Sequence, residues 1–306
     1  MIDKLVFLLA LAREEHFGRA ADACGVTQPT LSAGIKQLET TLGVLLVERG
    51  TRFVGFTPEG LRVLDWGRRI VGDARAMRDE LQARRDGLTG HLRLAAVPTA
   101  LPIIAKLTTP LRDLHPEVTF TVRSCTSGEV LGLLENLEID AGVTYVGNEP
   151  LGRVRHVPLY DERYALVVAA DDPLATRTSV GWADVGGARL CLLTPDMQNR
   201  RIIDRRLLQA GQEPHPVLES NSLMVLVSQV RTGRWASVLP VLMAEALLGD
   251  AMGPDAPIRA VPIQESEASP VIGLVYPLRE PLSPLTAALV TEARRLSESK
   301  SATATG

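Results

Sequence analysis

The stretch that decides the fold is His16–Leu38, HFGRAADACGVTQPTLSAGIKQL, because it encodes two short helices separated by a glycine turn. Its first half is rich in alanine, which combines high helix propensity with little bulk. Gly25 follows at the place where a helix ends in a left-handed residue. Thr27 can cap the next helix through its hydroxyl, and Pro29 is tolerated in the first turn. The stretch therefore predicts a helix-turn-helix.

The second of these helices has one apolar and one polar face. Leu31, Ile35 and Leu38 recur at i, i+4 and i+7 and predict a buried stripe. Gly34 is expected to weaken the helix by about 1 kcal/mol relative to alanine. The outer face carries short side chains that could reach base edges and phosphates in a major groove. The residues predicted to contact DNA on this helix and its flank are Thr27, Gln28, Pro29, Thr30, Ser32, Ala33, Lys36 and Gln37. The alternative is the solvated face of an ordinary helical hairpin.

The flanking segments add a predicted wing and a few basic residues. Residues 44–48 and 53–57 could form two short strands, the second of which alternates in the manner of a strand. The formal net charge of the whole chain is −3, so any attraction to DNA must be local. Arg19 in the first helix, and Arg49 and Arg52 around the wing tip, are the further candidates for DNA contact. An exposed arginine in an ordinary hairpin turn is the alternative at the tip.

A long helix is predicted to follow, because Thr57 supplies a hydroxyl cap and Pro58 suits the first helical turn. The pattern continues to near Gly87. Its apolar residues recur at coiled-coil spacing and favour pairing with a second subunit. The residues assigned to this dimerisation seam are Leu64, Val71, Ala74 and Leu81. Packing against a later part of the same chain is the alternative.

From His91 onward the pattern changes to strands alternating with helices, after a hinge that contains Gly87 and Gly90. The order βαβαβ predicts a parallel sheet, and ligands bind such sheets beyond the carboxyl ends of the strands. Small and polar residues stand at two of these ends and predict a site for a small carboxylate or other anion. They are Thr99, Ala100, Thr126 and Ser127. The alternative for the hydroxyl residues is simple helix capping.

Residues 26–60, VTQPTLSAGIKQLETTLGVLLVERGTRFVGFTPEG, resemble the amino-terminal domain of LysR-type transcriptional regulators, and the resemblance continues over almost the whole chain. It implies an all-α winged helix-turn-helix domain over 1–58 and a linker helix for dimerisation over 59–88. An α/β two-lobe effector domain, similar to periplasmic binding proteins, would occupy 91–306. Pairing of its lobes as in those proteins would bring a third strand end, with Thr194 and Asp196, to the same effector cleft. Its first lobe would comprise about 91–162 and 268–296, and its second lobe about 163–267.

The resemblance implies a cytoplasmic homodimer or homotetramer that binds double-stranded promoter DNA under the control of a small-molecule effector, with RNA polymerase as a further partner. No cofactor and no membrane contact are expected. A thiol-based redox regulator on the same scaffold is the alternative, through Cys125 or Cys191. Peroxide-sensing members use a cysteine pair in the second lobe, where this chain has Cys191 alone. Cys24 is expected in a core.

Metal binding and catalysis are not expected. The three cysteines have neither CxxC spacing nor histidine partners at ligand spacing. The five histidines are scattered along the chain, and no set of nucleophile, base and orienting residue is evident. The tail after Ser297, rich in Ser, Thr and Ala, is expected to be disordered.

Overall fold

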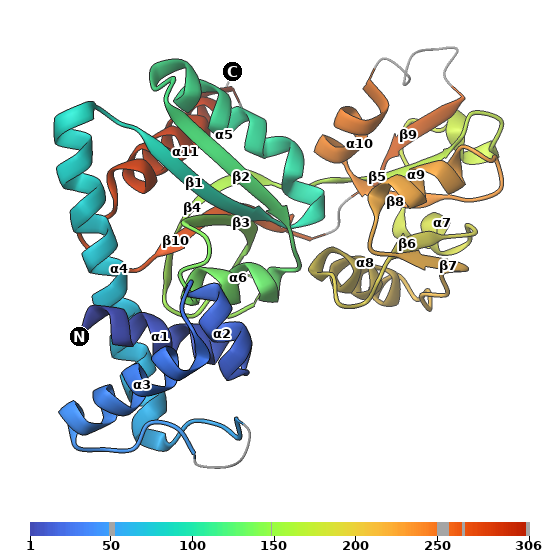
Figure 1. Ribbon diagram of the computed structural model, residues 1–306. Coiled ribbons are helices and arrows are strands. Elements are labelled where there is room, and N and C mark those ends of the chain that lie inside the picture. The colour runs from blue at the N-terminus through green and yellow to red at the C-terminus, as the bar shows by residue number, and fades with distance from the viewer. Residues whose placement is uncertain (49–52, 148, 250–256, 265–266, 304–306) are drawn as a thin grey trace.

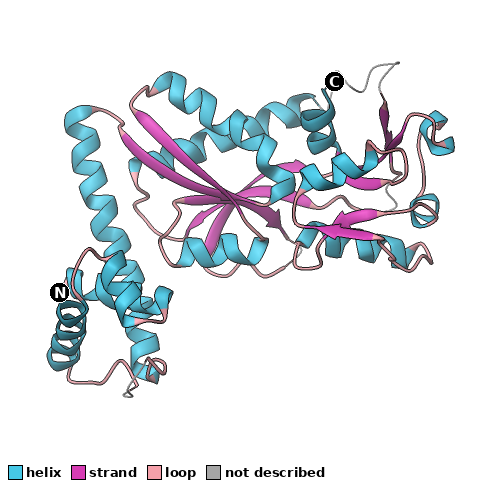
Figure 2. Ribbon diagram, turned by 45° about the vertical axis from the view of Figure 1, so that its right-hand side comes forward, coloured by secondary structure: helices cyan, strands magenta, loops and turns pink. Residues whose placement is uncertain are grey.

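A helical amino-terminal unit, one long helix and two α/β lobes make up the molecule (Figure 1). The computed structural model describes all residues except 49–52, 148, 250–256, 265–266 and 304–306. The long helix α4 (Pro58–Asp86) connects the amino-terminal unit to the lobes, which extend away from it side by side (Figure 2). No helix in the described ranges is long and apolar enough to span a membrane.

The amino-terminal unit is built on three helices with a shared apolar core. They are α1 (Ile2–Glu14), α2 (Phe17–Ala23) and α3 (Gln28–Leu42). The core includes Leu8 and Leu11 of α1 together with the predicted stripe of Leu31, Ile35 and Leu38. The Thr27 hydroxyl accepts a hydrogen bond from the Thr30 N–H, as expected for the cap of α3. The predicted helix-turn-helix is confirmed.

Gly34 has a packing role that its helix propensity does not reveal. A Cβ atom at this position would lie 2.6 Å from the ring of Phe7 in α1. The glycine therefore lets α1 approach α3 closely. Any substitution here would push the two helices apart, so the small loss of helix propensity is offset by packing.

The wing is less regular than expected. Val47 and Phe56 form one antiparallel bridge, and the Glu48 N–H donates to the Gly55 carbonyl at 3.0 Å. The Thr57 N–H donates to the Leu46 carbonyl at 3.0 Å on the other side of the bridge, so the two segments predicted over 44–48 and 53–57 do pair, but as one bridge and not as two regular strands. Phe56 packs edge-on against Phe53, with ring centroids 5.1 Å apart. This aromatic contact adds to the few backbone hydrogen bonds that hold the wing in place.

The first lobe is a five-stranded sheet covered by helices. Its strand order is β2-β1-β3-β10-β4. The strand β1 pairs in parallel with β2 and β3, which confirms the βαβαβ prediction, whereas β10 is antiparallel to both of its neighbours. The strands are β1 (Gly90–Ala96), β2 (Val118–Ser124), β3 (Ala141–Val146), β4 (Val154–Asp161) and β10 (Val271–Pro277). The helical elements are the 3-10 turn η1 (Pro98–Ala100), α5 (Leu101–Leu114), α6 (Ser127–Glu135) and α11 (Pro284–Thr303).

The second lobe contains two small sheets. One has the order β8-β5-β9 with antiparallel pairs, and the other pairs β6 with β7 in parallel. The strands are β5 (Tyr164–Ala169), β6 (Cys191–Leu193), β7 (Leu218–Ser220), β8 (Ser237–Pro240) and β9 (Ile258–Pro262). The helical elements are η2 (Pro173–Thr176), α7 (Trp182–Gly186), α8 (Gln198–Gln209), α9 (Leu223–Val230) and α10 (Val241–Leu248).

The carboxyl-terminal segment differs from the prediction. The helix α11 continues to Thr303, so the expectation of disorder after Ser297 is wrong for residues 298–303. Leu289, Val290 and Ala293 of this helix are buried in the core of the first lobe. Burial of that stripe anchors the helix, and its polar last turns extend from the anchored part.

Candidate nucleic-acid interface and interlobe site

The outer face of α3 is accessible, as DNA contact requires. Its half-buried member is Ser32, and the exposed residues are Thr27, Gln28, Pro29, Thr30, Ala33, Lys36 and Gln37. Arg19 is also exposed, but its guanidinium donates to the Glu14 carbonyl and lies 3.7 Å from the Glu14 carboxylate. The predicted contacts of Arg49 and Arg52 lie outside the described residues. The structure thus presents a polar helix surface with Lys36 as its one cation among the described residues of α3.

The linker helix exposes a different apolar stripe from the predicted seam. Leu64 and Val71 are 3% and 2% exposed and belong to the core formed with α1. They are therefore unavailable to a second chain, and the assignment of these two residues to the seam is corrected. Ala74 is half-buried. The large apolar side chains that α4 leaves exposed are Leu61, Trp66, Ile70, Met77 and Leu81. Among the four residues of the predicted seam, Leu81 is the one large apolar side chain that is exposed.

The predicted effector residues of the first lobe follow two adjacent strands, β1 and β2. Thr99 and Ala100 are almost fully buried in the turn η1. Thr126 caps α6, because its hydroxyl accepts from the Glu129 N–H while the Glu129 carboxylate accepts from the Thr126 N–H. Ser127 is 5% exposed and its Oγ has no hydrogen-bond partner among the described residues. Helix capping therefore describes Thr126 well, whereas Thr99 and Ser127 point into the protein.

The second lobe contributes residues at the end of β6. The Oγ1 of Thr194 is buried without a partner in the described part of the chain, whereas Asp196 is exposed. Two further side chains, which the sequence analysis missed, begin α8: the buried Gln198 and Asn199. The Gln198 Nε2 also lacks a described partner. The Asn199 amide donates to the Tyr145 hydroxyl of the first lobe at 3.3 Å, so the two lobes meet at this point.

A buried carboxylate, Glu162, lies between the two lobes and is linked to Thr99 and Asn199 through the Tyr145 hydroxyl. The Glu162 Oε2 accepts hydrogen bonds from the hydroxyls of Tyr145, at 2.6 Å, and Tyr164, at 2.8 Å. The Tyr145 hydroxyl also lies 3.3 Å from the Thr99 hydroxyl. Burial raises the pKa of Glu162 to about 7. The interlobe site is defined here as Thr99, Ser127, Tyr145, Glu162, Tyr164, Thr194, Gln198 and Asn199.

Two of the four arginines of α8, Arg200 and Arg206, are buried. Arg200 is 5% exposed and pairs with Asp204 at 2.7 Å and with Glu219. Arg201 bridges the lobes by an ion pair with Glu149 at 2.8 Å. These ion pairs hold the start of α8 at the interlobe site. Because Arg200 and Arg201 are already paired with carboxylates, they are not free to bind an anionic ligand there.

The cysteines are free thiols with raised pKa values. Cys191 is fully buried in β6, and burial raises its pKa to about 11. Cys125 is 8% exposed, and burial raises its pKa although the Arg123 charge opposes this. Cys24 is half-buried, and its pKa is raised as well. No group of residues suited to a metal ion is present in the described part of the chain.

Two family models match the chain. The LysR substrate binding domain matches residues 85–297, and the bacterial regulatory helix-turn-helix protein of the lysR family matches residues 2–61. The chain belongs to the LysR family. It is a LysR-type DNA-binding regulator with a helix-turn-helix domain and a two-lobe effector domain.

Relatives with similar sequences include the regulator OxyR and a protein named for induction by hydrogen peroxide. The DNA-binding transcriptional dual regulator OxyR of Escherichia coli K12 is 31% identical over 288 residues, which are 93% of this chain and 90% of that protein. The hydrogen peroxide-inducible genes activator of Dickeya chrysanthemi is 30% identical over 286 residues, again 93% and 90%. Among solved structures, a full-length cysteine-to-aspartate variant of OxyR from Pseudomonas aeruginosa superposes with a TM-score of 0.74 at 27% identity, covering 96% of this chain and 97% of that one.

Proposed function

We propose that this LysR-family regulator changes its binding to promoter DNA in response to an oxidant, with hydrogen peroxide as the candidate. The observation that carries the proposal is the similarity, over 93% of the chain, to a regulator named as a hydrogen peroxide-inducible genes activator, that of Dickeya chrysanthemi. This favours the redox alternative of the sequence analysis over control by a carboxylate. The regulator would act in the cytoplasm together with RNA polymerase.

Cys125 is the residue that we assign to this response. It follows β2 directly and precedes Thr126, its N–H donates to the Ala96 carbonyl at the end of β1, and its side chain packs beside Val130 of α6. Its thiolate would attack one oxygen of the peroxide and release hydroxide, leaving a sulfenic acid. Because burial raises the pKa of Cys125, the thiolate fraction is small near neutral pH. The reaction should therefore accelerate as the pH rises.

The deciding experiment measures DNA binding before and after hydrogen peroxide with the upstream region of the regulator's own gene as the probe. The variants are Cys125→Ser, Cys191→Ser and Cys24→Ser, with mass spectrometry to locate any added oxygen. We expect the response to disappear in Cys125→Ser alone. A response that persists in all three variants and in the triple variant would refute thiol-based sensing.

A second candidate is control by a ligand bound without covalent chemistry at the interlobe site. It is favoured by the buried polar atoms without described partners, the Ser127 Oγ, the Thr194 Oγ1 and the Gln198 Nε2. Buried groups of this kind cost free energy unless a ligand or water satisfies them. Replacing Ser127 by alanine should abolish this response and leave a response through Cys125 intact. The two candidates are thus separable.

The oligomer is proposed to be a homodimer joined through the exposed stripe on α4, which includes Trp66, Ile70, Met77 and Leu81. A dimer places two α3 helices on two half-sites with fixed spacing, which one helix cannot do. Assembly of two dimers into a tetramer is compatible with the same contact. Analytical ultracentrifugation of the full chain measures both steps.

A further inference from the structure

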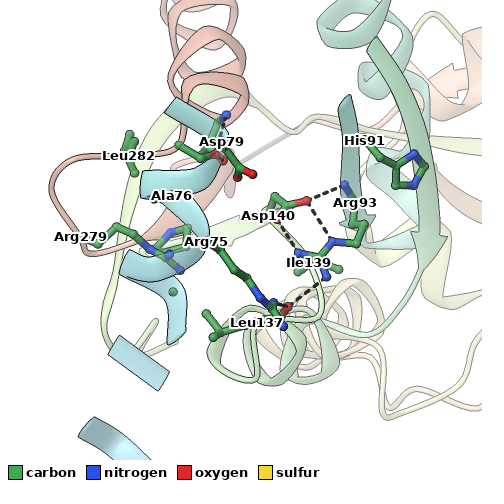
Figure 3. A pocket seen from close by; sticks show the side chains of 14 residues that line it. Arg75, Ala76, Asp79, His91, Arg93, Leu137, Ile139, Asp140, Arg279 and Leu282 are labelled. Carbon is green, nitrogen blue, oxygen red and sulfur yellow. Dashed lines mark hydrogen bonds and ion pairs between the residues drawn. The ribbon is translucent and has the colours of Figure 1, made fainter. Parts of the chain in front are cut away.

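A separate cavity of about 340 Å³ lies between α4 and the first lobe (Figure 3). Its walls come from α4, from β1, from the segment that precedes β3 and from the segment between β10 and α11. The interlobe site contributes no residue to these walls. The volume suits a ligand of small-metabolite size.

Three arginines line the cavity, and two of them lack a carboxylate partner. Arg93 is paired with Asp140 through two hydrogen bonds, of 2.7 and 3.2 Å. Arg75, from α4, donates to the Leu137 carbonyl at 3.1 Å. Among the described residues, no acidic side chain lies within ion-pair distance of Arg75 or Arg279. The cavity therefore offers two cations without an ion pair of their own, one from α4 and one from the first lobe, although Asp140 acts on both from a longer distance.

An acidic side chain in the same cavity is also unpaired. Asp79 lies one helical turn beyond Arg75 and has no ion-pair partner in the described ranges. Burial raises the pKa of Asp79, with the nearby Asp140 charge adding to the shift. Burial likewise lowers the pKa of both Arg75 and Arg279, and repulsion from Arg93 adds to the shift of Arg75. The charge of Arg75 opposes the shift of Asp79, and both residues are exposed, so charges of both signs line one cavity without a direct ion pair between them.

Gly72 brings α4 against one of these cations. A Cβ atom at this position would lie 2.5 Å from the guanidinium of Arg279. Because Gly72 has no side chain, the guanidinium of Arg279 can lie directly against α4, and the two together line one side of the cavity. A larger residue would push Arg279 out of its place beside the helix.

We propose that this cavity binds a small zwitterion of the α-amino acid class. Arg75 and Arg279 would hold its carboxylate by charge-assisted hydrogen bonds, and Asp79 would hold its ammonium group. A simple carboxylate would leave Asp79 unpaired, and a simple amine would leave both arginines unpaired. A molecule that carries both groups satisfies all three.

A ligand bound in this cavity would change the angle between α4, which leads to the DNA-binding domain, and the first lobe. The ligand bridges α4 to that lobe, where Arg68 already forms an ion pair with Glu135 at 3.4 Å. Gly87 and Gly90, at φ +77° and +127°, follow α4 and allow the joint to change its angle. A ligand that prefers one angle shifts the separation of paired α3 helices. This effect is independent of the oxidant response.

The test is thermal unfolding of the full-length chain with each of the twenty standard amino acids at millimolar concentration, followed by calorimetric titration of those that stabilise it. Each stabilising amino acid is compared with two matched probes, the same molecule without its amino group and its carboxamide. We expect both probes to bind at least about tenfold more weakly. The variants Asp79→Asn and Arg279→Gln should show a similar loss.

Two controls make the outcome decisive. Arg85→Gln removes a cation from the end of the same helix but outside the cavity, and Ser127→Ala alters the interlobe site; both should bind the amino acid as the unaltered chain does. Operator binding without ligand verifies that each variant is folded. The proposal is overturned if no amino acid stabilises the chain, or if Asp79→Asn and Arg279→Gln retain full affinity.

Discussion

Replacement of Glu162 by glutamine should change how the stability of the regulator depends on pH. Glu162 is 1% exposed, and burial raises its pKa from 4.5 to about 7. The folded state therefore binds a proton more tightly than the unfolded state does. The resulting stabilisation is fully present below the unfolded pKa and is lost as the pH rises to about 7.

The magnitude follows from the size of the shift. Each pKa unit corresponds to about 1.4 kcal/mol, so Glu162 should lower the free energy of unfolding by about 2 to 3 kcal/mol between pH 5 and 8. Glutamine stays neutral across this range, and its amide oxygen can still accept from Tyr145 and Tyr164. The difference in stability between Glu162→Gln and the unaltered chain should therefore grow by that amount in favour of the variant.

Urea unfolding at several pH values measures this difference. Trp182 is a suitable fluorescent reporter, because its ring lies 6.0 Å from that of Tyr164. Glu117→Gln, at an exposed position, is the matched control and should leave the pH dependence unchanged. If the free energy of unfolding changes with pH in the same way for Glu162→Gln and for the unaltered chain, burial does not raise the pKa of Glu162.

Further predictions concern α4 and the DNA-binding face. Leu64→Ala should lower the free energy of unfolding by about 2 to 5 kcal/mol in urea denaturation, because Leu64 is buried against α1. Leu81→Ala, at a side chain 58% exposed, should preserve stability and weaken the dimer in ultracentrifugation. A Leu64→Ala variant that weakened the dimer without loss of stability would restore Leu64 to the dimer seam. Lys36→Ala should reduce the salt dependence of DNA binding by about one unit in a plot of log affinity against log salt, and an unchanged slope would place Lys36 off the phosphates.

Local sequence signals were sufficient for the helix-turn-helix and for the order of elements in the first lobe. Gly25, Thr27 and Pro29 each impose a constraint on their own neighbours, so their effect can be inferred without knowledge of tertiary contacts. The parallel arrangement of β1, β2 and β3 likewise follows from the alternation of strands and helices. These features were predicted because near neighbours determine them.

The seam on α4 and the full interlobe site required contacts between distant segments. Helical spacing places Leu64 and Met77 on different faces of α4, and only the packing of α1 decides which face is buried. Glu162 gave no signal either, because the sequence around it does not show that Tyr145 and Asn199 approach the same carboxylate. Residues contributed by separate strands and lobes become a site only through the tertiary fold.

The measurement that tests the account most directly is the affinity of the full-length regulator for the upstream region of its own gene, determined by fluorescence anisotropy at moderate salt. The account predicts preference for this DNA over a random duplex of equal length, and loss of the preference when Gln28 and Thr30 on α3 are both replaced by alanine. Equal affinity for the two duplexes, or an unchanged preference in the double variant, would contradict it.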